Sequence, residues 1–260
     1  MLVESSIRSG GTSERAALVT GAYGEIGQRI VWRLAESGYL PILVDHPDAK
    51  RNNLNAIRDV LDAGAVSIFT DLSSPGGVES VTNRIETEFR SLSCIVHCAS
   101  PPIHPTPACL TEEEGMDRQI SVAALCLAGL CRSLVPLMQR QQRGVIVGML
   151  STVLETPRPK CWWNYTVGKF ALHGVLTGLS TDVEGSGVRV VSVMPGAVRS
   201  RLSRDAGVSQ QQTMEPDSVA KLVVGIVGDE RRFRNGDVVR VDGDKVEIGG
   251  FEFVCRRGAE

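Results

Sequence analysis

The chain has 260 residues and a mass of 28.0 kDa, with a formal net charge of −2 and only 5% aromatic residues. This length suits one α/β domain, and no Pro-, Gly- or Ser-rich linker divides it. The scattered basic residues form no stripe for a phosphate backbone and few aromatic residues are present to stack on bases, so we expect no nucleic-acid partner.

The apolar runs and the cysteines indicate the cellular compartment of the protein. No uninterrupted apolar run reaches the roughly 18 residues of a bilayer span, and the N-terminal segment is polar. Seven cysteines, an odd number without a C-x-x-C pair, indicate reduced thiols that fill apolar segments. We therefore expect a cytoplasmic protein with no membrane segment and no metal site.

Short runs rich in Val, Ile and Ala alternate with amphipathic stretches, as in buried parallel strands joined by helices. Strands are predicted at 16–20, 41–45, 65–70, 94–98, 145–150, 188–193 and 237–241. Helices are predicted at 25–37, 48–63, 76–91, 112–140, 163–184 and 216–228. This order predicts one Rossmann-type, doubly wound parallel sheet of about seven strands, with helices on both faces.

The ends of the chain fall outside this pattern. Residues 1–14 are predicted to form a flexible N-terminal segment, and residues 15–243 the domain. The extension 244–260 alternates like an added strand or hairpin, and the sequence assigns it no role.

A glycine-rich string, T-G-A-Y-G-E-I-G, lies where the first strand turns into a helix. Gly21, Gly24 and Gly27 would let backbone approach phosphate, and the helix N-terminus would face its charge. The alternative for such a triad alone is a tight turn that binds nothing.

Asp45 ends the second predicted strand, where a carboxylate can accept both hydroxyls of an adenosine ribose and would repel a 2′-phosphate. This favours NAD over NADP. The nearby His46, Lys50 and Arg51 leave NADP open, and an Asp here could instead cap the next helix.

A second string, Y-T-V-G-K, puts Tyr165 and Lys169 one helical turn apart. A tyrosine near pKa 10 is a poor base at neutral pH, and a neighbouring ammonium would favour the phenolate and lower that pKa. The alternative is a tyrosine and a lysine side by side on the surface of a helix without a catalytic role. The position of the pair after the fifth predicted strand argues against this alternative.

The ordered set of motifs resembles the short-chain dehydrogenase/reductase family, in its short single-domain branch, from about residue 15 to 243. The set comprises T-G-x-x-G-x-x-G, D-L at 71–72, a Ser after strand five, Y-x-x-x-K, P-G and V-D-G at 241–243. The resemblance implies an oxidoreductase that uses NAD, with NADP as the alternative, to interconvert a secondary alcohol and a ketone on a small or medium substrate.

By this resemblance, Tyr165 is the general acid/base, Lys169 holds the nicotinamide ribose, and Ser151 hydrogen-bonds the substrate oxygen. Family spacing points to Thr152 for the hydroxyl, whereas strand register favours Ser151, which we prefer. The resemblance places the cofactor against Gly21, Tyr23, Gly24, Ile26, Gly27, Asp45, Asp71, Leu72, Cys98, Ala99, Tyr165, Lys169, Pro195, Gly196 and Val198.

Three positions depart from the family pattern. Glu25 stands where this branch has its middle glycine, and H-C-A-S at 97–100 replaces N-N-A-G, with His97 interpreted as a packed strand-end residue. Ala123 replaces an asparagine that helps to hold a water beside the lysine. These departures keep two alternatives open. One is a non-catalytic NAD-binding scaffold or redox sensor, and the other, from the glycine spacing, is a nucleotide-sugar epimerase or dehydratase.

The surroundings of the site are less specific. Trp162 and Trp163 could wall an apolar substrate pocket or contact a second subunit. The polar segment 199–214 sits where the family keeps a lid. Because the helices 112–140 and 163–184 carry more leucines than one sheet face needs, we expect a homodimer or homotetramer.

Overall fold

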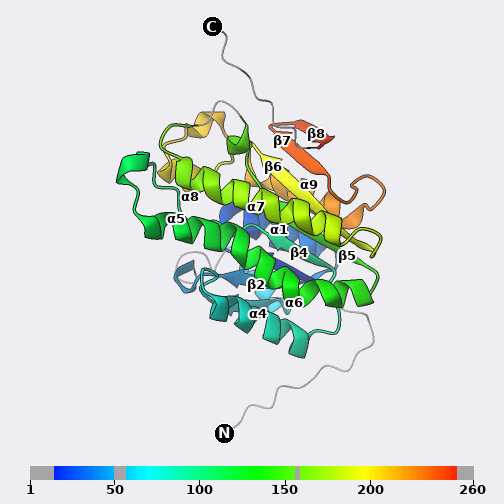
Figure 1. The fold of residues 1–260 in the computed structure, drawn as a ribbon. Coiled ribbons are helices and arrows are strands. Elements are labelled where there is room, and N and C mark those ends of the chain that lie inside the picture. The colour runs from blue at the N-terminus through cyan, green and yellow to red at the C-terminus, as the bar shows by residue number, and fades with distance from the viewer. Residues whose placement is uncertain (1–14, 50–56, 156–158, 251–260) are drawn as a thin grey trace.

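A computed structural model describes residues 15–49, 57–155 and 159–250. Its core is an eight-stranded sheet in the order β3-β2-β1-β4-β5-β6-β7-β8 (Figure 1). The strands are β1 (Ala16–Thr20), β2 (Leu40–Asp45), β3 (Val66–Phe69), β4 (Cys94–His97), β5 (Gly144–Met149), β6 (Val188–Pro195), β7 (Val238–Asp242) and β8 (Lys245–Gly249). The first seven run parallel, and β8 pairs antiparallel with β7.

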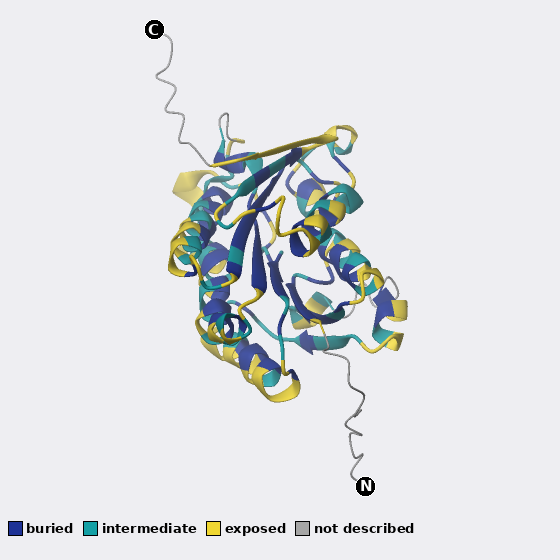
Figure 2. Cartoon of the chain, turned by 90° about the vertical axis from the view of Figure 1, so that its right-hand side faces the viewer, coloured by how far each residue is buried: buried dark blue, intermediate teal, exposed yellow. Residues whose placement is uncertain are grey.

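Helices cover both faces, which confirms the predicted doubly wound, single-domain architecture. One face carries α4 (Pro75–Glu88), α5 (Glu113–Ile120), α6 (Cys126–Arg140) and α7 (Trp163–Asp182). The other face carries α1 (Glu25–Glu36), α3 (Arg58–Asp62) and α9 (Pro216–Gly228). Figure 2 shows the buried strands between these two helical layers, and each layer closes its own hydrophobic core. An eighth strand, contributed by the extension, is added to the expected seven.

The predicted helix 48–63 needs correction. Between β2 and β3 the described residues form a 3₁₀ turn, η1 (Pro47–Ala49), and the short α3, which ends before Gly64 at φ +105°. Residues 50–56 lie outside the described part of the chain.

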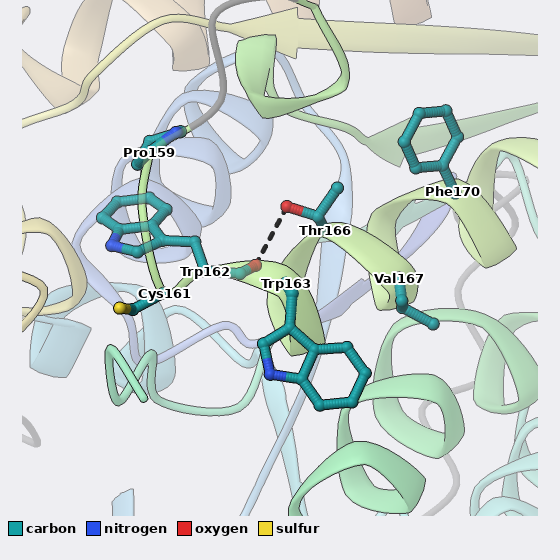
Figure 3. A pocket seen from close by; sticks show the side chains of 7 residues that line it. All are labelled: Pro159, Cys161, Trp162, Trp163, Thr166, Val167 and Phe170. Carbon is teal, nitrogen blue, oxygen red and sulfur yellow. Dashed lines mark hydrogen bonds between the residues drawn. The ribbon is translucent and has the colours of Figure 1, made fainter. Parts of the chain in front are cut away.

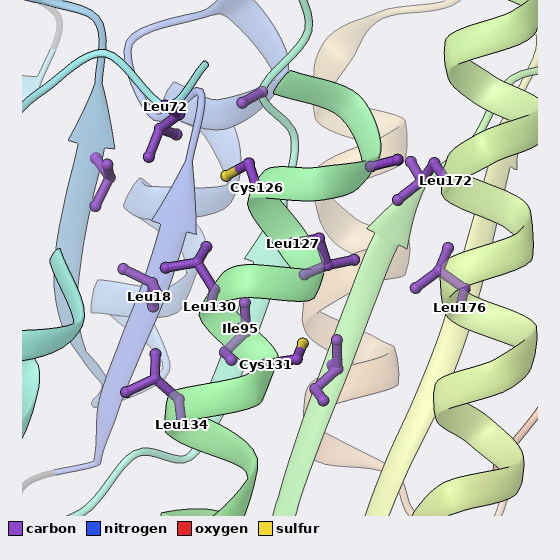
Figure 4. Packing of buried hydrophobic residues seen from close by; sticks show 14 of the residues in the cluster. Leu18, Leu72, Ile95, Cys126, Leu127, Leu130, Cys131, Leu134, Leu172 and Leu176 are labelled. Carbon is purple, nitrogen blue, oxygen red and sulfur yellow. The ribbon is translucent and has the colours of Figure 1, made fainter. Parts of the chain in front are cut away.

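The predicted helix 112–140 is not a single α-helix. A π-helical segment, η4 (Ser121–Leu125), separates α5 from α6, and the three together run continuously from Glu113 to Arg140. By length and composition alone this stretch could cross a bilayer, a test that the core helix of a globular protein also passes. In the structure it lies along the sheet, where Leu127, Leu130 and Leu134 are fully buried (Figure 4).

Short elements complete the chain around the carboxyl ends of the strands. They are η3 (Ala108–Leu110), η5 (Thr152–Leu154), α8 (Arg201–Asp205) and η6 (Gln210–Gln212). The predicted lid, 199–214, contains the last two, and an isolated bridge between Val198 and Met214 closes its base.

Candidate active site

The predicted site residues gather at one edge of the sheet. Parallel strands bring their carboxyl ends to the same edge, which is where α/β sheets hold ligands. The residues there are Gly21 after β1, Asp45 at the end of β2, Asp71 after β3, Cys98 after β4, Ser151 after β5 and Pro195 at the end of β6. The structure therefore assembles at one edge residues that are widely separated in the sequence.

The glycine-rich turn is tight enough to require its glycines. Gly21 has φ of +65°, and a Cβ there would lie 2.8 Å from the Ala99 amide nitrogen. A Cβ on Gly27 would overlap the Gly21 carbonyl oxygen. Gly24 is exposed and forms the N-cap of α1, so it leaves the first helical N–H groups without a side-chain cap. Ile26 is half-buried against the core beside it.

Tyr23 and Asp45 connect this turn to β2. The Tyr23 amide donates to Asp45 Oδ2 at 2.8 Å, and the His46 amide donates to Oδ1 at 2.8 Å. Burial raises the pKa of Asp45, and the two amide hydrogen bonds oppose that rise. The Tyr23 side chain is 1% exposed, hydrogen-bonds Ser67 Oγ at 2.9 Å and packs on Phe69. Its ring therefore points into the core, and only its backbone lies at the edge of the sheet.

The remaining predicted cofactor residues line the same edge on either side. Asp71 accepts hydrogen bonds from the amide and hydroxyl of Ser73, which lower its pKa, and Leu72 is buried beside it. Ala99 is buried, and Cys98 is half-buried. On the β6 side, a Cβ on Gly196 would lie 2.7 Å from Asp242 Oδ1, and Pro195 and Val198 are buried.

Ser151, Tyr165 and Lys169 lie together beneath this edge. Ser151 follows β5 and hydrogen-bonds the Tyr165 phenol, whereas Thr152 begins the 3₁₀ turn η5. Tyr165 and Lys169 are 6% and 3% exposed on the sheet-facing side of α7. The ammonium Nζ lies 5.5 Å from the phenol ring centroid and donates to the Met149 carbonyl at 2.8 Å.

Burial decides the charge states of this group. It raises the pKa of Tyr165 to about 12, against a smaller lowering by the Ser151 hydrogen bond. It lowers the pKa of Lys169 to about 8. The expected depression of the phenol pKa by the ammonium is therefore wrong for this structure, because the cost of desolvating a phenolate dominates. At neutral pH the phenol is protonated.

Three polar residues that the sequence left outside the site take part in it. The Thr20 hydroxyl accepts from the Ala99 amide at 3.3 Å and bonds His97 Nδ1 at 2.8 Å. The Glu25 carboxylate accepts from the Arg201 amide at 2.7 Å, which joins the glycine turn to the segment 199–214. The position of Thr20 at the end of a strand could have indicated from the sequence that it belongs to the site. The hydrogen-bond partners of His97 and Glu25 could not have been predicted in this way, because tertiary contacts determine them.

A pocket of about 450 Å³ opens beside α7 (Figure 3). Its walls are Pro159, Cys161, Trp162, Trp163, Thr166, Val167 and Phe170. Trp162 meets the Tyr165 ring edge-on at 5.9 Å, but Tyr165 does not line the pocket. Trp163 Nε1 donates to Thr111 at 2.8 Å, which ties the pocket wall to the segment before α5.

Known proteins resemble this chain in sequence and in fold. The family model described as short chain dehydrogenase matches residues 15–211. The 3-oxoacyl-acyl-carrier-protein reductase of Escherichia coli is 26% identical over 239 residues, covering 88% of this chain and 96% of the relative.

Two solved structures share the fold. One is the 3-ketoacyl-acyl-carrier-protein reductase of Brucella melitensis in complex with NADH, with TM-score 0.79, 23% identity, and coverage of 90% of this chain and 99% of that one. The other is a metagenomic short-chain oxidoreductase in complex with NADP, with TM-score 0.75, 23% identity, and coverage of 90% and 100%. With its matching motifs, fold and family model, the chain belongs to the short-chain dehydrogenase/reductase family of oxidoreductases.

Proposed function

We propose that this protein is an NAD-dependent oxidoreductase that interconverts a secondary alcohol and a ketone on a small or medium organic substrate. The observation that carries the proposal is the group formed by the buried Tyr165 and Lys169 and the half-buried Ser151 beside the glycine-rich turn. A hydroxyl, a phenol and an ammonium at one sheet edge can together hold a substrate oxygen and exchange a proton with it.

The residues at the edge fit a dinucleotide. A side-chain-free turn at the N-terminus of α1 suits a pyrophosphate, and the carboxylate of Asp45 suits the hydroxyls of a ribose. When bound, the nicotinamide supplies the hydride donor or acceptor. Lys169 would hold the ribose next to it, since its ammonium has N–H groups beyond the one bonded to Met149.

The charge state of the phenol suits the role of proton donor when a ketone is reduced. Since burial raises the Tyr165 pKa to about 12, the phenol carries its proton at neutral pH and can donate it to a carbonyl oxygen that becomes an alcohol. Ser151 would hold that oxygen from the β5 side. Tyr165 is then the proton donor, and Ser151 and Lys169 orient the reactants.

Asp45 supports NAD as the cofactor. Its carboxylate is fixed by the amides of Tyr23 and His46 at the end of β2, where a 2′-phosphate would meet a negative charge. His46 lies beside it and pairs with Asp48 at 3.4 Å. Asp45→Asn should relax the preference for NADH over NADPH at least tenfold, and a wild-type preference for NADPH would contradict this assignment.

A second function has its own support. The same fold could bind NAD without turnover, as a scaffold or redox sensor, because Glu25 places a carboxylate in the glycine turn and Ala123 lacks a polar side chain. Glu25 would then act by holding the segment 199–214 against the turn.

One experiment separates the two functions. NADH and NADPH oxidation at 340 nm is followed with a panel of ketones, and the reverse reaction with secondary alcohols, for wild type, Tyr165→Phe and the control Tyr39→Phe. Turnover lost only in Tyr165→Phe supports the enzyme, since Tyr39 is buried far from the site against Arg15. NADH binding without turnover on any substrate supports the scaffold.

We also propose a homodimer or homotetramer in which subunits meet through the outer face of α7. Trp163, Val167 and Phe170 line the apolar pocket on this face, and Leu125 of η4 is 59% exposed. Apolar side chains gathered on one surface are typical of subunit contacts. Light scattering after size exclusion should give twice or four times the chain mass, and Val167→Glu should give the monomer.

A further inference from the structure

His97, the last residue of β4, is 1% exposed and has hydrogen-bond partners at both ring nitrogens. Nδ1 lies 2.8 Å from the Thr20 hydroxyl, and Nε2 lies 3.0 Å from the Ala123 carbonyl oxygen. A carbonyl oxygen only accepts, so Nε2 must carry a hydrogen. Burial lowers the pKa of His97 to about 4, so the ring is neutral near pH 7 and Nδ1 accepts from the Thr20 hydroxyl.

On the strand side, the hydrogen bond from Thr20 connects His97 to the glycine-rich turn. Thr20, which donates to the ring, also accepts from the Ala99 amide at 3.3 Å. Ala99 in turn packs against Gly21, where an added Cβ would meet its nitrogen. A chain of hydrogen bonds therefore runs from Ala99, which packs against the glycine turn, through Thr20 and His97 to the helical segment that contains Ala123.

On the helix side, the bond ends in the π-helical segment η4 (Ser121–Leu125). A π-helical turn interrupts the regular α-helical ladder and is often found at functional sites. Ala123 has no polar side chain, so its backbone is the only part of it that a strand residue can hold. The Nε2–H group of His97 donates a hydrogen bond to the backbone carbonyl of Ala123.

The catalytic helix rests directly on this segment. α7 packs against α5 and η4, and a Cβ on Gly168 would lie 3.0 Å from the Gln119 carbonyl oxygen. Gly168 precedes Lys169, so the backbones approach closely next to the proposed ammonium. A shift of η4 by a fraction of an ångström would move Lys169 and Tyr165, on α7, relative to Ser151, which follows β5.

We propose that His97 is a positioning residue that fixes the π turn at Ala123 and through it sets Tyr165 and Lys169 against the cofactor turn. It touches neither substrate nor cofactor, and its effect is on the alignment of the residues that do. The mechanistic part of this inference rests on the proposed function, whereas the hydrogen-bond tether itself does not.

Two substitutions of similar size separate a tether from a space-filling role. His97→Leu removes both hydrogen bonds, and His97→Gln retains an N–H donor and an oxygen acceptor. In hydrogen–deuterium exchange of the full chain, His97→Leu should speed exchange at least fivefold in 119–126 and 163–170 while α9 stays at the wild-type rate. His97→Gln should restore most of the protection. Equal exchange in both variants, or a uniform rise across the chain, would overturn the tether.

A direct measurement covers the case in which the leucine variant does not fold. Long-range ¹⁵N–¹H spectra of ¹⁵N-histidine-labelled wild type, assigned with His97→Gln, should show His97 as the Nε2–H tautomer from pH 5.5 to 8.5. An Nδ1–H tautomer, or titration near pH 6.5, would overturn the proposal.

Kinetics tests the mechanistic part. On a ketone turned over by wild type, His97→Leu should lower kcat at least tenfold and change the KM for NADH less than threefold, with recovery in His97→Gln. An unchanged kcat in His97→Leu overturns the positioning role even if turnover stands. If no ketone is turned over, the proposed function fails while the exchange and tautomer results still decide the tether.

Discussion

The Glu25 carboxylate accepts a hydrogen bond from the Arg201 backbone amide at 2.7 Å, across 176 positions of sequence. Glu25 is the first residue of α1 in the glycine-rich turn, and Arg201 is the first residue of α8 in the segment 199–214. The turn proposed to hold the pyrophosphate is thus tied directly to the proposed lid, and it carries a negative charge of its own.

Glu25→Gln should tighten NADH binding about three- to tenfold. The substitution keeps an acceptor for the Arg201 amide but removes a charge that repels phosphate, an effect of roughly 1 kcal/mol for well-solvated charges about 4 Å apart. NADH fluorescence titration measures it, and added salt should shrink the gain. Glu36→Gln at the far end of α1 is the control, and equal affinities for Glu25→Gln and wild type would contradict the prediction.

Two glycines of the turn should respond differently to alanine. A Cβ on Gly27 would overlap the Gly21 carbonyl oxygen and lie 2.9 Å from Ala22 Cα, so the turn cannot close around it. Gly27→Ala should weaken NADH binding at least tenfold and lower the melting temperature by several degrees. A Gly24 Cβ would be 3.3 Å from the same oxygen, and the residue is exposed at φ −73°.

Gly24→Ala is therefore the matched variant, with NADH affinity expected within threefold of wild type. The measurements are fluorescence titration and a thermal melt of both variants. Loss of binding in both would show that the glycines serve the phosphate and not the turn, and loss in neither would remove the steric argument.

The sequence predicts most of the sheet because its strands are buried on both faces. Runs such as Val145 to Met149 are apolar throughout and indicate parallel strands without reference to partners. β8 is different, since all its residues are exposed and only pairing with β7 defines it. The π turn at Ser121–Leu125 is hidden because apolar periodicity runs through it, and its position depends on the contact with His97.

The candidate site likewise has features that the sequence predicts and features that depend on tertiary contacts. Strand ends bring Gly21, Asp45 and Ser151 to one edge, and a strand order inferred from the sequence is enough to expect that. The direction of a side chain and its charge state cannot be predicted from the sequence in this way. Tyr23 is aromatic and adjacent to the turn, but packing sends its ring toward Phe69. The phenol of Tyr165 has a raised pKa because of burial, a property of the assembled core.

Arg33 and Asp217 form a two-bond ion pair, at 2.6 and 2.7 Å, that joins α1 to α9. The hydrogen bond from Arg33 lowers the pKa of Asp217 to about 2 from an ordinary value of 3.8. A carboxyl whose pKa is lower in the folded state stabilises the fold above the unfolded pKa, and this contribution is lost as pH falls toward the folded pKa.

Asp217→Asn should lower the free energy of unfolding by roughly 1 kcal/mol at pH 7, the value expected for a bidentate pair at a partly exposed site. The difference from wild type should shrink as pH falls from 5 to 3. Urea denaturation at several pH values measures it, with Asp205→Asn, an exposed i,i+4 pair, as the control. A difference that grows toward low pH would contradict the assignment.

Lys169 should lower the free energy of unfolding at neutral pH, because its ammonium is charged and buried. Burial lowers its pKa to about 8 from 10.5, so the unfolded chain binds the extra proton between these values. The cost of burying the ammonium is therefore fully present below pH 8 and is relieved as pH rises toward 10.5. Lys169→Met removes that cost and also leaves the Met149 carbonyl without its ammonium partner.

Lys169→Met should thus unfold with a free energy about 1–2 kcal/mol higher than wild type at pH 7, since several kcal/mol of desolvation outweigh one hydrogen bond. The advantage should decline from pH 8 to 10.5 and reach zero or reverse there, when wild type retains its hydrogen bond with a neutral amine. Urea unfolding across this range tests the prediction, with Lys221→Met, at an exposed lysine, as the control. A variant less stable than wild type at pH 7, with a deficit that does not change with pH, would show that Lys169 is held without an electrostatic cost.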